Sequence, residues 1–234
     1  MSLLYDARQI AKRDPAARSV VGVIFLYSGF HAIVYYRVSH FFYRHKLLSV
    51  ARWVSQVGRH KTGVEIHPGA KIGKGLFIDH GMGIVIGETA VIGDNCTIYH
   101  GVTLGGRGHS KGQRRHPVIG DNVLVGAGAK LLGPITVGND VSIGANAVVL
   151  HDIPDYATVV GVPGKVVRIE GKPTVSHAIE LDHSLSDDPL ETEMQQLVNT
   201  VNSLQGTIMD LREEIKDLRK ERASDNEEPD EGRC

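Results

Sequence analysis

The chain has 234 residues, with 27 acidic residues against 26 basic ones, so its overall charge gives no reason to expect nucleic acid as a partner. Glycines number 27 while aromatic residues make up only 6%, which suits a fold of short strands and corners. Its two cysteines cannot form a disulfide framework, and we expect Cys96 to be a small buried hydrophobe. The start has no charged-then-apolar leader, which predicts a cytoplasmic protein.

Residues 1–62 are expected to form a helical segment. Asp14 followed by Pro15 has the form of a helix N-cap with proline at the first helical position, and helices then continue to near Gly58. The apolar run 20–36 has about the minimum length of a membrane span, but polar and small residues interrupt it and a helical apolar stripe follows. We therefore expect it to pack within a soluble assembly, with no membrane partner.

An aliphatic residue returns at every sixth position over much of residues 63–172. The series is Ile66, Ile72, Ile78, Ile86, Ile92, Ile98, Leu104, Ile119, Val125, Leu131, Val137, Ile143 and Val149. A second apolar or small residue follows most of these by four positions: Ala70, Leu76, Met82, Ala90, Cys96, Val102, Val123, Ala129, Ile135, Val141 and Ala147. This period predicts a parallel β-helix of coils of about eighteen residues that share one buried axial core.

The first break in the repeat lies beside Asp79 and His80, where the series is displaced by two residues. Glu65 precedes His80 by fifteen residues, just short of one coil, so the two side chains can lie on adjacent coils. A carboxylate behind an imidazole holds the tautomer that accepts a proton from a hydroxyl group. We therefore expect chemistry at His80.

The second break is a spacing of fifteen residues between Leu104 and Ile119. It holds a basic, glycine-rich loop that ends in Arg115, His116 and the rigid Pro117. Such a loop can fold over a bound anion, so we expect a binding function here.

Residues 189–222 carry an unbroken heptad pattern, which predicts a coiled-coil helix. Leucine at d with β-branched residues at a favours two strands, whereas hexapeptide solenoids usually form trimers, and the sequence leaves the number of strands open. We expect residues 173–188 to be a linker and residues 223–234 to be an acidic disordered tail.

A set of motifs within residues 10–172 closely resembles the serine O-acetyltransferase family. They are EIHPGAKIGKGLFIDH at 65–80, GIVIGETAVIG at 83–93, VTLGG at 102–106, RHP at 115–117, RDPA at 13–16 and GFHA at 29–32. Generic hexapeptide acyltransferases share the repeats but not this set together. The resemblance implies a left-handed β-helix and transfer of the acetyl group of acetyl-CoA to the hydroxyl of L-serine. That reaction is the first step of cysteine biosynthesis.

The resemblance also implies residue roles on the acetyl side of the reaction. His80 would be the general base that takes the serine hydroxyl proton, and Glu65 would orient it. No metal is required. Four small residues match positions where the pantetheine arm runs in a groove between subunits: Gly105, Gly106, Ala127 and Ala145.

The serine side follows in the same way. The resemblance implies that Asp14 and Asp79 hold the amino group of serine, while Arg115 and His116 bind its carboxylate. Cysteine, the end product of the pathway, occupies the same pocket in feedback-inhibited members. The expected assembly is a homotrimer or a dimer of trimers. Members that dock into O-acetylserine sulfhydrylase end in isoleucine, and since this chain ends in Cys234 that partner is not expected.

Three other interpretations remain open. An O-acetyltransferase for a sugar or another hydroxyl acceptor would keep His80 without the residues that match an amino acid. A hexapeptide carbonic anhydrase needs three zinc-bound histidines, and the one His-x4-His pair, His40 with His45, lies in the helical segment. The chain could also be a scaffold whose coiled coil is the functional part.

Overall fold

The structure is a computed structural model that describes residues 3–108, 113–173, 200–201, 203–205 and 207–208. Residues 1–179 and 180–234 form two separate units. The expected linker, most of the expected coiled coil and the acidic tail lie outside the described residues. The described positions between 200 and 208 are helical.

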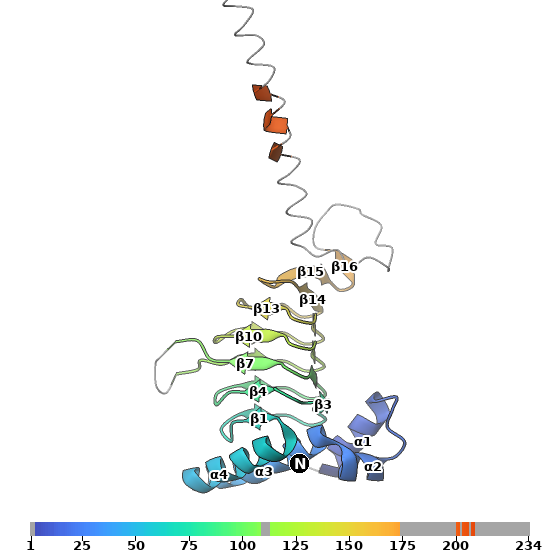
Figure 1. Cartoon of the computed structure of the whole chain (residues 1–234), viewed down its shortest axis with the longest axis vertical. Coiled ribbons are helices and arrows are strands. Elements are labelled where there is room, and N and C mark those ends of the chain that lie inside the picture. Colours follow the sequence, from blue (N-terminus) through green and yellow to red (C-terminus); the bar gives the residue numbers. More distant parts are fainter. Residues whose placement is uncertain (1–2, 109–112, 174–199, 202, 206, 209–234) are drawn as a thin grey trace, which may run out of the picture. The chain divides into compact units, whose positions relative to one another are not determined.

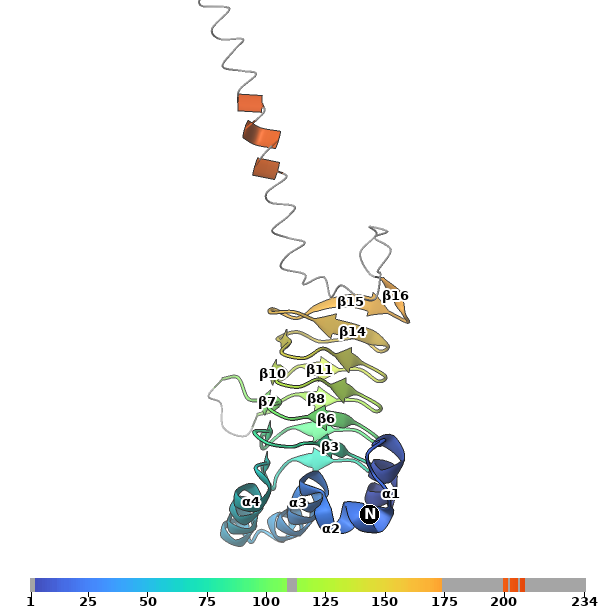
Figure 2. The same cartoon turned by 45° about the vertical axis from the view of Figure 1, so that its right-hand side comes forward.

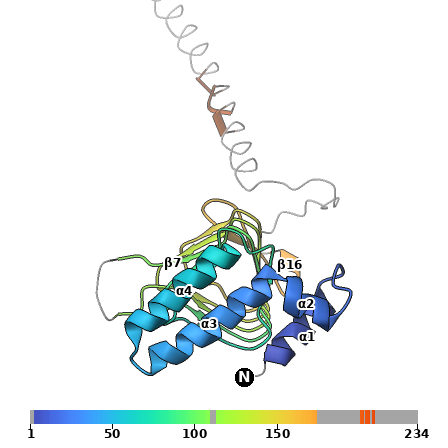
Figure 3. The same cartoon turned by 60° about the horizontal axis from the view of Figure 1, so that its bottom comes forward.

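Four helices precede the solenoid and lie across its first coil (Figures 1 and 3). They are α1 (Leu3–Arg13), α2 (Val20–Leu26), α3 (Ser28–Arg44) and α4 (Leu48–Thr62). Tyr36 of α3 ties the helices to the first coil, because its hydroxyl donates to the carbonyl oxygen of Ala70 over 2.8 Å. Within the described part of the chain, no single helix is long and apolar enough to span a membrane. α2 and α3 reach that limit only as a pair bent by 70°.

Two expected helix boundaries are wrong. Asp14 and Pro15 form a turn after α1, and the true N-cap is Ser19, whose hydroxyl accepts from the Gly22 amide over 3.0 Å. The expected end near Gly58 is four residues too early, because this glycine is a packing position. A Cβ there would lie 2.7 Å from Cβ of Tyr35. The helix stops at Thr62 instead, capped by Gly63 with a φ of 72°.

The strands form three sheets that wind into a solenoid (Figure 2). Sheet A contains β1 (Glu65–Ile66), β4 (Val85–Ile86), β7 (Thr103–Gly105), β10 (Lys130–Leu132) and β13 (Val148–Val149). Sheet B contains β2 (Lys71–Ile72), β5 (Val91–Ile92), β8 (Val118–Ile119) and β11 (Thr136–Val137). Sheet C contains β3 (Phe77–Asp79), β6 (Thr97–Tyr99), β9 (Leu124–Val125), β12 (Ser142–Ile143), β14 (Ala157–Val160), β15 (Lys165–Ile169) and β16 (Lys172–Pro173).

Pairing between coils is parallel until the last two strands, β15 and β16, which pair antiparallel and close the end of sheet C. The parallel β-helix expected from the six-residue period is therefore confirmed, and every aliphatic residue of the main series is buried. Cys96 is buried as expected. The handedness of the winding stays an expectation from the family resemblance.

Met82 is the exception among the second apolar positions. Its side chain was expected to be buried, but the residue is 67% exposed, and Ile84 takes the buried place at 0%. The reason is visible in the register, since Glu65 pairs with Val85 across 20 residues, whereas Val85 pairs with Thr103 across 18. The two extra residues enlarge the turn that follows β3, and this turn carries His80.

Acidic and amide side chains hold successive coils in register at the corner between sheets B and C. The Asp94 carboxylate accepts from the Lys74 amide over 2.7 Å, and the Asp121 carboxylate accepts from the Asp94 amide over 2.7 Å. Asn139 accepts from the Asp121 amide over 2.9 Å in the next coil. These bonds satisfy backbone donors that the corner leaves without a strand partner.

Candidate active site

The enlarged turn after β3 presents His80 to solvent. His80 has a φ of 56°, in the left-handed region, and the glycines at 81 and 83 also have positive φ. Its side chain is 74% exposed, and Nε2 lies 3.9 Å from Oδ1 of Asp79. An exposed imidazole on a fixed turn can receive a proton from a bound hydroxyl group.

His100 occupies the equivalent turn one coil further along. Asp79 pairs with Tyr99 between β3 and β6, which places the two following histidines next to each other. Their ring centroids are 5.7 Å apart in an edge-to-face arrangement. Sequence reasoning missed His100, although its position one coil after His80 was a usable signal.

Asp14 lies close to the His80 turn through Tyr27. The Tyr27 hydroxyl donates to Oδ2 of Asp14 over 2.6 Å, and Oδ1 of Asp14 accepts from the Ala16 amide over 2.7 Å. The hydrogen bond to Asp14, with burial and the negative charges of Asp14 and Asp79, raises the pKa of Tyr27 to about 12. Both aspartates therefore act on one phenol, which stays protonated at neutral pH. No sequence pattern pointed to Tyr27.

Close backbone packing brings α3 against the His80 turn. A Cβ on Gly29 would lie 2.2 Å from the carbonyl oxygen of Ile78, so only glycine lets the helix approach β3 this closely. The Ser28 hydroxyl also donates to the carbonyl oxygen of His80 over 3.5 Å. The GFHA motif therefore serves the geometry of the turn.

Replacing Tyr27 with phenylalanine should loosen Asp14. For the substrates that the family resemblance implies, we expect Tyr27→Phe to raise the KM for serine about 3- to 10-fold, since a hydrogen bond to a charged group is lost, while the KM for acetyl-CoA stays the same. Steady-state kinetics with each substrate varied in turn measures both constants. Tyr156→Phe, in the last coil, is the matched control. An unchanged serine KM in Tyr27→Phe would remove Tyr27 from the site.

At the second break in the repeat, between Leu104 and Ile119, hydrogen bonds from Thr89 hold the His116 ring. Oγ1 of Thr89 lies 2.8 Å from Nδ1 of His116, and the Thr89 amide donates to the same nitrogen over 3.2 Å. Because Nδ1 accepts, the neutral ring carries its proton on Nε2 and can donate from there. Burial lowers the pKa of His116, and the positive charge of Arg115 lowers it further, so the ring is neutral at pH 7.

The His116 ring fits against glycine. A Cβ on Gly87 would lie 2.0 Å from the ring, and one on Gly106 would lie 3.0 Å from Nε2. Arg115 is half exposed, with its guanidinium 3.5 Å from Oε2 of Glu88. The expected pair Arg115 and His116 is thus brought together at this corner, and sequence reasoning missed the supporting Thr89 and Glu88.

Glu65 does not contact His80 within one chain. Its two carboxylate oxygens lie 3.1 Å from the guanidinium of Arg52 and 3.3 Å from that of Arg59, both on α4. No hydrogen bond or ion pair joins Glu65 to His80 in the described part of the chain. The expected orienting role of Glu65 therefore has no intrachain contact behind it.

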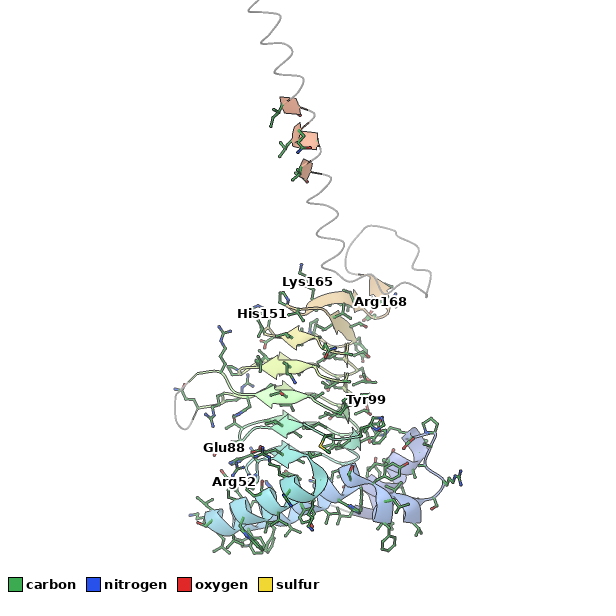
Figure 4. The ribbon with its side chains drawn as sticks, in the orientation of Figure 1. Arg52, Glu88, Tyr99, His151, Lys165 and Arg168 are labelled. Carbon is green, nitrogen blue, oxygen red and sulfur yellow. The ribbon has the colours of Figure 1, made fainter. Side chains whose placement is uncertain are left out.

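The two groups of candidate residues lie at opposite ends of the strands of sheet A. We call these two ends the His80 edge and the His116 edge. The His80 turn precedes β4, whereas the His116 ring lies against Gly87 just after it. Gly81 and Gly83 belong to the turn, and from Ile84 to Gly87 the chain makes three steps of extended structure through β4, which is about 10 Å. Figure 4 shows the same division, with Tyr99 on one side of the solenoid and Glu88 and Arg52 on the other.

The four small residues expected along the cofactor divide in the same way. Gly105 ends β7 and Gly106 follows it, both on the His116 side. Ala127 and Ala145 occupy successive turns on the His80 side, where the Asn146 amide donates to the carbonyl oxygen of Ala127 over 2.8 Å. Among the described residues, no group of three His, Cys, Asp or Glu side chains is arranged to hold a metal ion.

Two family models match the solenoid. The model for the bacterial transferase hexapeptide (six repeats) matches residues 116–151, and the model for the hexapeptide repeat of succinyl-transferase matches residues 83–107. These matches cover part of the solenoid and, with its parallel coils, indicate a hexapeptide-repeat transferase.

Comparison with individual proteins narrows the class. Serine acetyltransferase of Staphylococcus epidermidis is 52% identical over 192 residues, which are 82% of this chain and 88% of that protein. The chain therefore belongs to the serine acetyltransferase family. The crystal structure of Neisseria gonorrhoeae serine acetyltransferase matches with a TM-score of 0.70 and 44% identity. That match covers 71% of this chain and 64% of the other.

Two further solved serine acetyltransferases carry ligands. One is a complex with cysteine, at a TM-score of 0.68 and 44% identity, and it covers 70% of this chain and 67% of the other. The second is a complex with CoA, at a TM-score of 0.67 and 42% identity, covering 70% of this chain and 68% of the other.

Proposed function

We propose that this chain is an acetyl-CoA-dependent serine O-acetyltransferase of the cytoplasm. The observation that carries the proposal is the open turn where His80, Asp79 and Asp14 converge. A neutral sugar needs no pair of carboxylates beside the base, whereas the ammonium group of an amino acid does. The solved relatives in complex with CoA and with cysteine, which carries the same amino and carboxylate groups as serine, support a CoA thioester and an amino acid as the two substrates.

His80 is the proposed general base. Nε2 takes the proton from the serine hydroxyl as that oxygen attacks the thioester carbonyl of acetyl-CoA. The tetrahedral intermediate then collapses, the bond to sulfur breaks, and the proton passes from His80 to the departing thiolate. A thioester is already activated, so a positioned base worth about 10²–10⁴-fold and the proximity of both substrates supply much of the rate.

The other residues position serine. Its ammonium group lies between Asp14 and Asp79, and Tyr27 keeps Asp14 turned toward it. Its carboxylate pairs with Arg115 and accepts from Nε2–H of His116, whose Nδ1 is occupied by Thr89. Cysteine has the same two groups and differs only in its thiol, so it competes for this pocket as a feedback inhibitor.

The site is completed by a second copy of the chain. The His80 turn and the His116 ring lie at the two ends of β4, and no described contact joins them within one chain, so the His80 edge of one copy is placed against the His116 edge of the next. A head-to-tail contact of this kind closes into a ring, and a homotrimer is the proposed assembly. The acetyl-CoA groove then runs between copies, with Ala127 and Ala145 on one wall and Gly105 and Gly106 on the other. Glu65 would approach His80 across the same contact.

We assign each segment of the chain a separate role. Residues 63–172 form the catalytic β-helix and residues 1–62 cover its first coil. Residues 189–222 are proposed to add a coiled-coil contact between copies, joined through the linker 173–188 and followed by the tail 223–234.

The substrate is tested by CoA release. We expect release with acetyl-CoA and L-serine, inhibition by L-cysteine that is competitive with serine, and no release above background with sugar acceptors. Release measured with a thiol reagent needs a correction for cysteine, so mass detection of O-acetyl-L-serine is the better readout. A protein that acetylates a sugar and ignores serine would contradict the proposal.

A further inference from the structure

Helices α2–α4, which we call the base of the solenoid, contain basic residues but no acidic ones. Between Asp14 and Glu65 there is no Asp or Glu, although the whole chain is close to neutral with a formal net charge of −1. The same stretch contains seven basic residues: Arg18, Arg37, Arg44, Lys46, Arg52, Arg59 and Lys61. A concentration of one sign of charge attracts an anionic surface.

Three of these seven basic residues form ion pairs within the chain. Arg37 lies 3.8 Å from Asp6, and Arg52 and Arg59 pair with Glu65. The other four are exposed and form no ion pair with any described residue: Arg18, Arg44, Lys46 and Lys61. Four cations therefore stay free to meet a partner.

The same base exposes large apolar side chains. They are Val21 (63% exposed), Phe25 (72%), Leu26 (79%), Phe41 (57%), Leu48 (56%) and Trp53 (68%). Figure 3 shows α2, α3 and α4 spread across the end of the solenoid. α3 and α4 pack on the first coil, and α2 packs against α1 and α3. Burying such side chains against a partner is favourable, and exposed apolar patches of this kind mark interaction sites.

We propose that this base, made of α2–α4, binds the surface of an anionic lipid bilayer. Helices with Trp, Phe and Leu beside Lys and Arg lie in the headgroup region, where apolar burial and charge attraction act together. Each cation near an anionic leaflet adds to this attraction. Three copies in a ring would present three such bases at one end of the assembly, which multiplies the attraction.

Charge decides between a bilayer and a second copy of the chain on this face. Two copies meeting base to base would bring together two surfaces that are cationic and free of acids, and like charges across an interface are costly. This proposal departs from the sequence expectation of no membrane partner, which was argued from the insertion of the apolar run 20–36. A contact at the headgroup level requires no insertion of that run across the bilayer.

Trp53 is the one tryptophan of the chain, so its fluorescence reports on the base alone. With vesicles of phosphatidylglycerol and phosphatidylcholine, we expect its emission to shift to the blue and to be quenched by brominated lipid. With phosphatidylcholine alone, we expect binding at least about 10-fold weaker, and added salt should weaken binding to the anionic vesicles.

Matched variants separate the two contributions. Phe41→Gln with Leu48→Gln should abolish the shift, and Lys46→Gln with Lys61→Gln should remove most of the preference for anionic vesicles. Leu124→Gln and Lys71→Gln, on the outer faces of sheets C and B, are the controls and should bind as the parent does. Acetyltransferase activity without vesicles should be unchanged in all of them, which verifies folding. No shift with either vesicle overturns the proposal. So does a blue-shifted emission without vesicles that is lost on dilution, because a second copy then covers the face.

Discussion

His80→Ala is expected to lower kcat by at least about 10²-fold, because a positioned general base contributes 10²–10⁴-fold to such a transfer. Acetyl-CoA binding should change little, since the ring touches the reacting hydroxyl and not the body of the cofactor. The side chain is 74% exposed, so its removal leaves no cavity in the core. Single-turnover kinetics and direct CoA titration measure the two quantities separately.

His151→Ala is the control for His80→Ala. His151 is also exposed, at the far end of the solenoid from the helices (Figure 4), and its loss should leave kcat as it was. A His80→Ala enzyme that keeps more than about a third of the parent kcat would show that another group takes the proton.

Gly87→Ala should weaken serine binding indirectly, because the new methyl group displaces His116 and does not contact the substrate. The new Cβ would lie 2.0 Å from the His116 ring, which must then leave Thr89 and lose its fixed tautomer. We expect the KM for serine to rise at least about 10-fold, the loss of one hydrogen bond to a charged group. The KM for acetyl-CoA and the melting temperature should be much less affected.

Gly22→Ala, inside α2, is the matched substitution, because an added Cβ there meets only the Ser19 hydroxyl, at 3.3 Å. It should leave both KM values as they were. If Gly87→Ala instead behaves like Gly22→Ala, His116 is not a carboxylate ligand in the arrangement described here.

The six-residue period predicted most of the solenoid because one buried side chain per strand is a strictly local requirement. Ile66 and Leu104 take the same inward place in their coils, so the spacing of such residues identifies the coils. Met82 shows where the rule fails. The turn after β3 gained two residues, and the periodic count could not tell which apolar residue, Met82 or Ile84, would take the inner place.

The candidate site was harder to predict, because it depends on contacts between distant parts of the chain. The loop residues Arg115 and His116 come together next to each other, as expected from their sequence. The link from Asp14 through Tyr27 to the His80 turn depends on how α1–α3 pack on the first coil, which no local pattern specifies. The pairing of Glu65 with Arg52 and Arg59 likewise follows from the position of α4.

The most direct test of the account is to mix two inactive chains. A chain with His80→Ala and a chain with His116→Ala are given different tags, produced together, and purified through both tags in turn. In a ring of three where each site joins the His80 edge of one chain to the His116 edge of the next, one site in every mixed trimer is intact. The account therefore predicts that about a third of the parent activity returns. Activity no higher than that of the two variants alone would contradict it, because both halves of the site would then belong to a single chain.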